Sequence, residues 1–211
     1  MKKLLPFLPL LAVMALAISC SNEKPSATSE EAVSEQPTGP SGVYNLDINQ
    51  SVIKWRGDML GIKFHEGTLN LTEGTIIVDN GRVTGGKFVA DLSSMVPTDE
   101  NYQPETGYSK DKLVTHLKSA DFFDVANYPT AIFNVTGAYD NNTNGKMTIR
   151  GRTHNEVVKD ILVTDMGNGT IKATGQLNFD RQQYGVSWSS GAKDAVLSDN
   201  IALTIELVAV Q

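Results

Sequence analysis

Apolar and polar residues alternate with a period of two through most of the chain beyond residue 42. In the stretch SVIKWRG, Ile53 and Trp55 fall on one face and Lys54 and Arg56 fall on the other. The closing stretch NIALTIELVAV repeats the pattern, and its apolar set is Ile201, Leu203, Ile205, Leu207 and Ala209. This period is that of a β-strand with one buried face. We therefore predict a chain built mainly of strands.

Turn signals separate these strands at short intervals. Asn80-Gly81, between TIIV and RVTGGKFVADL, is a strong hairpin signal because both residues tolerate positive φ. Gly85-Gly86 predicts a bulge or a sharp bend. DNNTNG at 140–145 predicts a turn, and Gly167-Asn168-Gly169 separates two further strands. In the first of those two strands the alternation predicts a common face for Val157, Lys159, Ile161 and Val163.

Strands in this number, roughly eight or more, with short turns between them, predict one antiparallel sheet with an apolar inner face. A sheet of that size either stacks as a sandwich or closes into a barrel. The alternation alone does not choose between the two, but the bends and glycines favour closure. Small inward residues leave volume for a ligand, and the small positions predicted to face inward are Gly67, Ala90, Ala131, Ala173 and Gly175.

One segment interrupts the strands. Residues 109–119 have helical spacing, and Ser109 is a suitable N-cap. Phe122-Phe123 follow the helix, and Tyr128-Pro129 turns the chain into the next strand. We interpret the segment as a lid on one end of the sheet structure, with the two phenylalanines as a plug. Direct contact with a ligand is the alternative. The apolar stripe of the helix is Leu113, Val114 and Leu117.

The N-terminus has the pattern of a bacterial lipoprotein signal. A basic start at residues 1–3 precedes the apolar run Leu4–Ile18, which is shorter than the about 20 residues of a spanning helix. Cys20, the single cysteine, follows small residues. We predict that residues 1–20 are a signal peptide and that Cys20 carries a palmitate-type lipid anchor. An ordinary secretory signal with an incidental cysteine is the alternative.

The organisation of the rest follows from composition. Residues 21–42 are rich in proline, serine and glutamate and predict a flexible acidic tether. Residues 43–211 have the size of one domain. We therefore expect a domain in the cell envelope, anchored to a membrane through Cys20 and facing the periplasm or the exterior.

Charge and motif content argue against several functions. The formal net charge of −6 comes with no basic cluster for nucleic acid. The three histidines, His65, His116 and His154, lie far apart without the spacing of metal ligands, and no nucleophile motif accompanies them. We expect no metal, no cofactor and no enzymatic activity. A hydrolase that uses His116 with Asp121 or Asp124 is the weakest alternative.

Several motifs in order resemble the YceI-like family of polyisoprenoid-binding, lipocalin-like proteins. They are YNLDINQSVIKW, FHEGTLNLTEGTIIVDNG, DKLVTHLKSADFFDVANYPTAIFNVT, KMTIRGRTHNEVV, LNFDRQQYGVSW and VLSDNIALTIELVA. Together they cover nearly all of residues 43–211. The loop SSMVPTDENYQPETGYSK at 93–110 is longer than the short acidic link of the family.

The resemblance implies an all-β fold, namely an eight-stranded antiparallel barrel with a short helical insertion. It implies a long isoprenoid ligand, a polyprenyl phosphate or a quinone-type lipid, held by a periplasmic or membrane-tethered carrier or storage protein. It implies no agreed catalytic residues, and it admits a homodimer. A tethered barrel with a packed interior, which binds a protein or a glycan on its outer face, is the alternative.

Strand parity within such a barrel predicts the pocket. The lipid tail is expected to contact Ile53, Trp55, Phe64, Leu69, Phe88, Phe133, Val135, Ile149, Leu177, Phe179 and Trp188. The head group and the mouth are assigned to His65, His116, Phe122, Arg181 and Tyr184. Among these, Phe64, Phe122, Tyr184 and Trp188 are expected to close the ends of the barrel.

Overall fold

The computed structural model describes residues 39–60, 63–189 and 196–211. The chain divides into two units, Met1–Ser34 and Glu35–Gln211, and every described residue belongs to the second. The predicted signal peptide, the predicted lipid anchor at Cys20 and most of the predicted tether lie outside the described residues. No helix in the described part of the chain is long and apolar enough to cross a membrane.

The described residues form mainly strands, with one α-helix and three short 3-10 turns. The strands are β1 (Gly42–Leu46), β2 (Val52–Leu60), β3 (Lys63–Leu69), β4 (Leu71–Asp79), β5 (Arg82–Asp91), β6 (Val96–Pro97), β7 (Thr130–Tyr139), β8 (Asn142–Ile149), β9 (Arg152–Gly167), β10 (Thr170–Asp180) and β11 (Val196–Val210). The helical elements are η1 (Leu92–Ser94), η2 (Pro104–Thr106), α1 (Lys110–Lys118) and η3 (Arg181–Tyr184).

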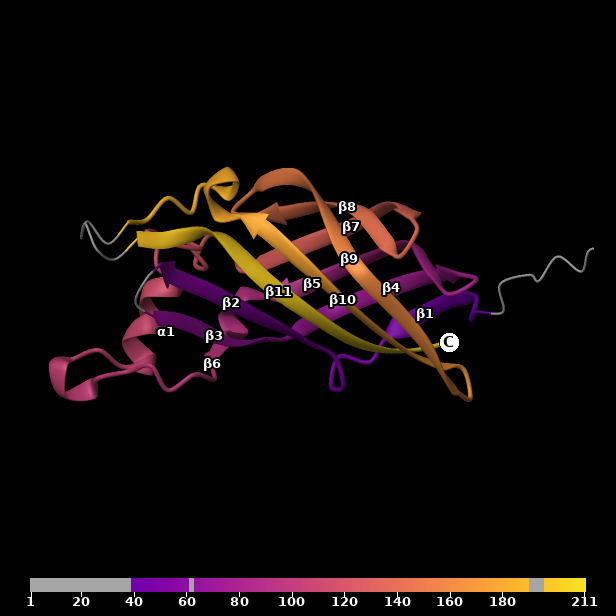
Figure 1. Cartoon of the computed structure of the whole chain (residues 1–211), viewed down its shortest axis with the longest axis horizontal. Helices are drawn as coiled ribbons and strands as arrows, with labels where there is room; N and C mark the ends of the chain where they lie inside the picture. Colours follow the sequence, from indigo (N-terminus) through magenta and orange to yellow (C-terminus); the bar gives the residue numbers. More distant parts are fainter. Residues whose placement is uncertain (1–38, 61–62, 190–195) are drawn as a thin grey trace, which may run out of the picture. The chain divides into compact units, whose positions relative to one another are not determined.

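The strands close into a ring. β1 and β2 both pair with one edge of β11, where Val52 lies opposite Glu206 and Asn45 lies opposite Val210. β4 pairs with β1 and β3 pairs with β2, so β3 and β4 together occupy the second strand position around the barrel. β5 pairs with β4 and β6 pairs with β3, so β5 and β6 occupy the third. β7 to β11 complete the ring, each antiparallel to the next. The result is a closed eight-stranded antiparallel barrel, so the predicted fold class is confirmed (Figure 1).

The hairpin signals have a simple geometric basis. Asn80 and Gly81 have φ of 48° and 76°, and they join β4 to β5 in the predicted two-residue turn. The pairing of β4 with β5 shifts in register between Ile77 and Val78, opposite the predicted bend at Gly85-Gly86. Gly86 has a φ of 144°, and a Cβ there would lie 2.4 Å from the carbonyl oxygen of Thr75. Glycine therefore permits the sharp bend at this point.

The turn predicted over residues 140–145 is shorter in the structure. Asp140, with φ of 48°, and Asn141 suffice to reverse the chain, and β8 already begins at Asn142. The predicted extent of this turn is therefore wrong. Thr143 lies buried within the strand, where its hydroxyl donates to the carbonyl oxygen of Val83 at 2.8 Å. This hydrogen bond satisfies the buried Thr143 hydroxyl, although the polar residues around Thr143 in the sequence indicate a loop.

The face predicted for β9 is also wrong, because a bulge changes its parity. Thr174 of β10 lies opposite Leu162, but Gln176 lies opposite Lys159, so β9 carries one extra residue here. Asp160 adopts a φ of 53° at the bulge. Before the bulge Val158 is buried while Lys159 is exposed, so Val157 and Lys159 do not share a face with Ile161 and Val163.

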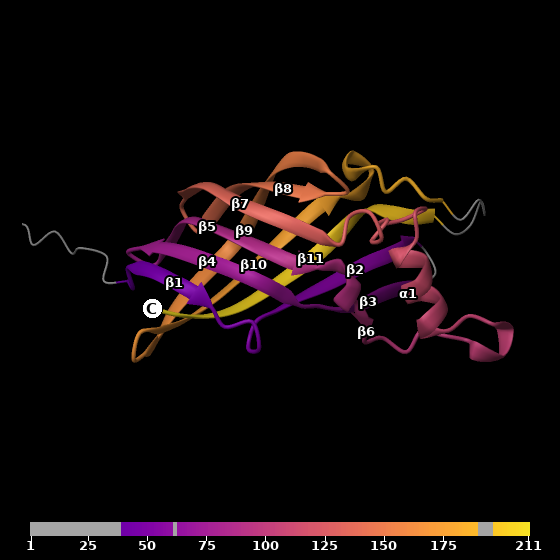
Figure 2. The same cartoon turned by 180° about the vertical axis from the view of Figure 1, so that it is seen from behind.

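The interior holds two groups of buried apolar residues. One group includes Leu117 of α1 and Phe122 just after it. The other includes Tyr44 of β1, Ile76 of β4 and Ile171 of β10. The helix α1 lies at one end of the barrel beside β3 and β6, while β1 and the C-terminus lie toward the opposite end (Figures 1 and 2). The two ends of the barrel therefore differ in how they are closed.

Candidate functional site

The barrel encloses a cavity of about 510 Å³ with an almost entirely apolar wall. Its volume lies within the range of small-molecule sites, about 300–1,000 Å³. Several inward side chains, among them Phe88, Phe133 and Leu203, are only partly buried although they point into the barrel. Their exposed surface faces the cavity, so the interior is hollow. A packed interior, as the alternative reading of the sequence required, is not what the structure has.

Most residues assigned to the lipid tail line this cavity. They are Ile53, Trp55, Leu69, Phe88, Phe133, Val135, Ile149, Leu177, Phe179 and Trp188. Among the small residues, Ala90, Ala131, Ala173 and Gly175 also line it, whereas Gly67 does not. A Cβ at Gly67 would lie 2.6 Å from the Trp55 indole, so this glycine makes room for the tryptophan. Contact between the lining residues and a ligand stays a prediction.

Phe64 lies outside the cavity lining. It belongs to β3, and the guanidinium of Arg56 lies 3.7 Å from the centre of its ring. Arg56 also pairs with Asp58 at 2.9 Å and with Glu66 at 3.3 Å, and all of these charged side chains are substantially exposed. Phe64 therefore packs under a charged cluster on the outer face, because it has the opposite parity to its neighbour His65.

Helix α1 closes the barrel at one end, as predicted. Ser109 caps it by accepting a hydrogen bond from the Lys112 N–H at 3.3 Å. Its inner face contributes side chains to the cavity wall, and the two phenylalanines that follow contribute as well. These wall residues are Lys112, Leu113, His116, Leu117, Phe122 and Phe123. The segment therefore both seals the end and reaches the cavity.

His116 has an unusual position within this seal. Its ring meets Phe122 and Trp188 edge-on, with ring centres 5.5 and 4.7 Å apart. His116 lines the cavity, and its Nε2 is buried without a hydrogen-bond partner among the described residues. A buried polar atom without a partner is costly. A polar group of a ligand would satisfy it.

Arg150 anchors the seal to the barrel wall, a role that the sequence motifs did not reveal. Its guanidinium donates to the carbonyl oxygens of Phe122 and Gly185 at 2.7 Å each, and to that of Ala120 at 3.2 Å. These bonds join the chain after α1 to the turn after η3. Arg150 therefore sets the position of Phe122 at the cavity end.

Arg181 and Tyr184, assigned to the mouth from the sequence, lie outside the cavity lining. Arg181 is 2% exposed and donates to carbonyl oxygens of the segments before and after the stretch 190–195, including those of Trp188 and Ser198. Tyr184 is fully buried, and its hydroxyl donates to Glu156 at 2.8 Å. Burial and then this hydrogen bond raise the Tyr184 pKa. Both residues therefore stabilise the barrel wall through buried hydrogen bonds and do not line the cavity.

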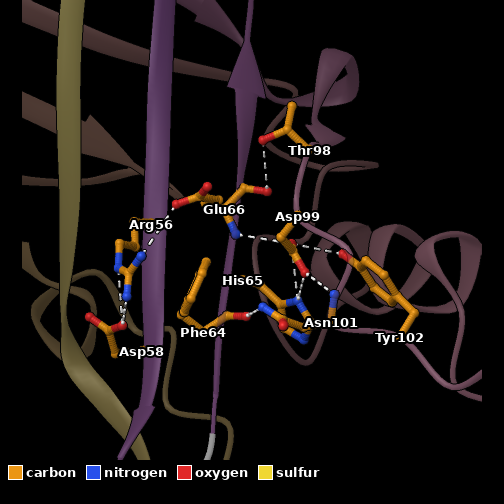
Figure 3. A network of polar contacts seen from close by, with 9 residues as sticks. All are labelled: Arg56, Asp58, Phe64, His65, Glu66, Thr98, Asp99, Asn101 and Tyr102. Atoms are coloured by element: carbon orange, nitrogen blue, oxygen red, sulfur yellow. Dashed lines mark hydrogen bonds and ion pairs between the residues drawn. The ribbon is translucent and has the colours of Figure 1, made fainter.

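A buried polar network lies where the loop 98–108 folds against β3 (Figure 3). The carboxylate of Asp99 accepts hydrogen bonds from the backbone N–H of Asn101 at 2.9 Å, from that of Glu66 at 3.1 Å and from the Tyr102 hydroxyl at 3.0 Å. His65 Nδ1 lies 3.1 Å from the same carboxylate. Asp99 is therefore held by donors from both the loop and the strand.

Tyr108 completes this network on the cavity side. Its hydroxyl is hydrogen-bonded to Nε2 of His65, and both residues line the cavity. The ammonium of Lys63 lies 3.8 Å from the centre of the Tyr108 ring. The His65 and Tyr102 rings stack with their centres 5.1 Å apart. Stacking, cation–π contact and hydrogen bonds together fix the orientation of the three rings.

Protonation states in the network follow from burial and hydrogen bonding. Burial acts to raise the Asp99 pKa, but the bonds from Asn101, Glu66 and Tyr102 outweigh it and hold that pKa below its ordinary value. Burial lowers the His65 pKa, and the nearby Asp99 charge offsets this only in part. Burial and the Asp99 charge raise the Tyr108 pKa. Near neutral pH, Asp99 is therefore ionised, His65 is neutral and Tyr108 keeps its proton.

A YceI-like domain matches residues 44–209, which is most of the chain. The chain belongs to the YceI-like family. The family resemblance stated from the sequence motifs is thereby confirmed. No curated protein matches the chain.

Two solved structures share the YceI-like fold with this chain. BcnA from Burkholderia cenocepacia aligns with a TM-score of 0.63 at 20% identity, over 78% of this chain and 99% of BcnA. A polyisoprenoid binding domain from Saccharophagus degradans, implicated in plant cell wall breakdown, aligns with a TM-score of 0.51 at 12% identity, over 79% and 97% of the two chains. At these identities the likeness shows the fold alone.

Over the described ranges 39–60, 63–189 and 196–211, no group of three or more histidine, cysteine and acidic side chains is placed to hold a metal. The hydrolase alternative requires a carboxylate paired with His116. In the described part of the barrel the ring neighbours of His116 are Phe122 and Trp188, and its Nε2 has no hydrogen-bond partner. Asp99, Tyr102 and Tyr108 are the site residues that sequence reasoning missed.

We expect the free energy of unfolding to decrease in two steps as the pH is lowered. His65 causes the first step and Asp99 causes the second. The His65 pKa is lower in the folded state, so stability present above its ordinary value of 6.5 is lost as the pH falls below it. The Asp99 pKa is also lowered, so its contribution is present above 3.8 and is lost as the pH falls through the folded pKa. Urea denaturation between about pH 3 and about pH 8 measures both steps.

Two variants assign these steps to residues. His65→Gln is expected to flatten the upper step relative to the wild type, and Asp99→Asn the lower one. Subtracting each variant curve from the wild-type curve removes the contribution of distant titrating groups, and the coupling between His65 and Asp99 stays in the difference. A variant curve that runs parallel to the wild-type curve through its step would show that the residue does not cause it.

Proposed function

We propose that this protein binds one long-chain isoprenoid lipid inside the barrel, with the tail in the apolar cavity and the head group at the α1 end. The observation that carries the proposal is the closed, hollow barrel with an apolar cavity of about 510 Å³. Family membership and the likeness to the polyisoprenoid binding domain of Saccharophagus degradans support it. A polyprenyl phosphate or a quinone-type lipid is the class of ligand proposed.

The energetics of such a site rest on the tail. Apolar surface removed from water contributes about 25 cal/mol per Å². Association consumes about 4–15 kcal/mol through lost translation and rotation, and ordering a flexible tail adds to this cost. A long apolar tail is therefore needed for tight binding, and a few polar contacts suffice to position the head group.

The polar residues of the cavity wall determine the proposed orientation. Most of them belong to α1, to the segment just after it, or to the loop and strand beside it; they are His65, Tyr108, Lys112, His116 and Asp121. The others are Thr143 and Thr174, and the Thr143 hydroxyl already donates to the Val83 carbonyl oxygen. The opposite part of the wall is closed by the apolar cluster that contains Ile76. A head group would leave its polar atoms unsatisfied against that cluster, whereas at the α1 end it finds partners.

The cellular role proposed is that of a carrier or storage protein in the cell envelope. The predicted anchor at Cys20 and the tether up to residue 42 would hold the barrel at a membrane, facing the periplasm or the exterior. This location and the possible homodimer rest on the sequence expectations. Neither a metal nor a cofactor is required by the proposal, and the isoprenoid is a ligand rather than a reactant.

The decisive experiment identifies the lipid that copurifies with the protein. Full-length protein produced with its own signal segment is purified in mild detergent, and mass spectrometry is applied to the intact complex and to its organic extract. The expected result is one isoprenoid lipid per chain. Absence of any bound lipid, together with no uptake of a prenyl quinone or a polyprenyl phosphate by the purified protein, would refute the proposal.

His116 provides a prediction about the head group. His116→Phe keeps a ring against Phe122 and Trp188 and removes the unpartnered nitrogen. We expect about three- to tenfold weaker binding of the copurifying lipid, the effect of one lost hydrogen bond. Stability without ligand should be unchanged or slightly higher. Titration followed by tryptophan emission measures the affinity, because Trp55 and Trp188 both line the cavity.

The matched control is His154→Phe. His154 lies outside the cavity lining and meets Tyr184 edge-on behind the wall. It should bind the lipid as the wild type does. If His116→Phe also binds with wild-type affinity, the head group does not contact His116.

A further inference from the structure

We propose that Tyr108 is the residue that selects the head group, because the network behind it makes its oxygen a hydrogen-bond acceptor facing the cavity. The ligand class that this chemistry fits carries a free hydroxyl, as prenyl alcohols and the hydroquinone form of prenylated quinones do. Head groups that only accept hydrogen bonds fit less well. The inference rests on the proposed function and deepens it, since it concerns the ligand of the same cavity.

The argument begins at Asp99, which the loop and the strand supply with donors. The backbone N–H groups of Asn101 and Glu66 are donors only, so the Asp99 carboxylate accepts a hydrogen bond from each of them. With its carboxylate ionised and 2% of its side chain exposed, Asp99 is a strong acceptor for the Nδ1 proton of His65 at 3.1 Å. The proton of the neutral His65 ring is therefore held on Nδ1.

The tautomer of His65 then sets the role of Tyr108. A neutral imidazole with its proton on Nδ1 has a bare Nε2, which only accepts. The hydroxyl hydrogen-bonded to this Nε2 belongs to Tyr108, so it is the donor. Its proton is thereby committed to His65, and the lone pairs of its oxygen remain for a ligand at the cavity wall that both residues line. The ring cannot easily reorient, because Lys63 lies over one face of it.

The cavity wall makes this oxygen selective. A ligand hydroxyl can donate to Tyr108, whereas a ketone, an ether or a quinone carbonyl presents only lone pairs to it. A phosphate monoester has a second pKa of about 6 and also presents mostly acceptors near neutral pH. The charged residues that reach the described wall, Lys112 and Asp121, are of opposite sign. The wall therefore offers no net positive charge to compensate a phosphate.

The test compares a matched pair of ligands, geranylgeraniol and its methyl ether, near neutral pH. Tryptophan emission of the full-length protein follows each titration. For the wild type we expect the alcohol to bind about three- to tenfold more tightly than the ether, the effect of one neutral hydrogen bond. In Tyr108→Phe the ratio should fall to about one, because the acceptor is gone.

Two further variants separate this role from a merely structural one. In His65→Phe the Tyr108 hydroxyl is free to donate or to accept, so the ratio should also fall to about one. Tyr102→Phe removes a hydroxyl from the same network at a residue outside the cavity lining, and should keep the wild-type ratio. Thermal unfolding shows which variants fold. If Tyr108→Phe does not fold, the ratio in His65→Phe decides.

A second pair of ligands distinguishes the two sources of the hydroxyl. A prenylated benzoquinone and its hydroquinone are titrated under anaerobic conditions. A preference for the hydroquinone alongside the alcohol supports a general hydroxyl site, and a preference for the alcohol alone restricts the class to prenyl alcohols. Equal affinity of the wild type for alcohol and ether, or a ratio that persists in Tyr108→Phe, overturns this inference and leaves the proposed function standing. If none of these ligands binds, this inference is overturned, and the proposed function is then decided by the copurifying lipid and by the uptake of a polyprenyl phosphate.

Discussion

Ala131→Trp is expected to abolish lipid binding while leaving the barrel folded. Ala131 lines the cavity and lies opposite Ala90, another small wall residue, in the pairing of β5 with β7. A tryptophan at this position would occupy the space that the lipid tail requires. We expect the affinity to fall at least about 100-fold, which corresponds to about 2.7 kcal/mol. Overpacking a well-packed core costs about 1–3 kcal/mol, and the hollow interior should keep the cost near the lower value.

The control places the same side chain on the outer face. Ala202 of β11 lies between Ile201 and Leu203, which both line the cavity, so Ala202 points outward. Ala202→Trp should bind lipid as the wild type does. Titration and the amount of copurifying lipid measure both variants. Normal lipid content in folded Ala131→Trp would mean that the tail does not lie in this part of the barrel.

Arg181→Ala should cause the largest loss of stability. The Arg181 guanidinium is buried and donates to the carbonyl oxygens of Ser198 at 3.0 Å and of Trp188 at 3.1 Å, as well as to the carboxylate of Asp199 at 3.0 Å. Its removal leaves buried carbonyl groups without donors. Each buried group left unsatisfied costs about 1–3 kcal/mol, so we expect a loss of about 3–5 kcal/mol in total. Asp199, whose side chain is 56% exposed, adds little to this loss. Urea denaturation measures the loss, and lipid affinity should fall with it because Trp188 is no longer held at the wall.

Arg82→Ala is the matched control. Arg82 is exposed, and it donates a hydrogen bond to the carbonyl oxygen of Asp140 at 3.3 Å. Its loss should change the free energy of unfolding by less than about 0.5 kcal/mol. If Arg181→Ala were as stable as Arg82→Ala, the Arg181 network would not contribute to the fold.

The strands and the ends of the helical segment were predictable because their signals are local. The hairpin at Asn80-Gly81 depends on two residues that tolerate positive φ. Ser109 caps α1 through a neighbour three positions along the chain. The inward-facing residues of β11 follow from the alternation of apolar and polar residues within that strand. Such features need no knowledge of distant parts of the chain, and the apolar cavity wall was therefore largely identified in advance.

The polar part of the site was predicted less completely, because it depends on long-range pairing. His65 and His116 were singled out as isolated histidines, but the partners of His65, Asp99 and Tyr108, lie 34 and 43 residues away in a loop without regular pattern. Arg181 was assigned to the head group and the mouth. In the structure it is buried behind the wall, where carbonyl groups of two separate segments converge on it.

The sequence by itself determined the class of fold, the strand directions at the hairpins and the apolar character of the inner face, since these follow from periodicity and from turn residues. Only the tertiary structure decided the parity of β9, the length of the β7–β8 turn and the hydrogen-bond partners of His65. A bulge moves every later side chain of the strand to the opposite face of the sheet. Pairing and packing against β10 offset the energetic cost of the bulge. Partners from distant segments meet only once the ring of strands closes, so the polar network at the cavity wall is a property of the closed barrel.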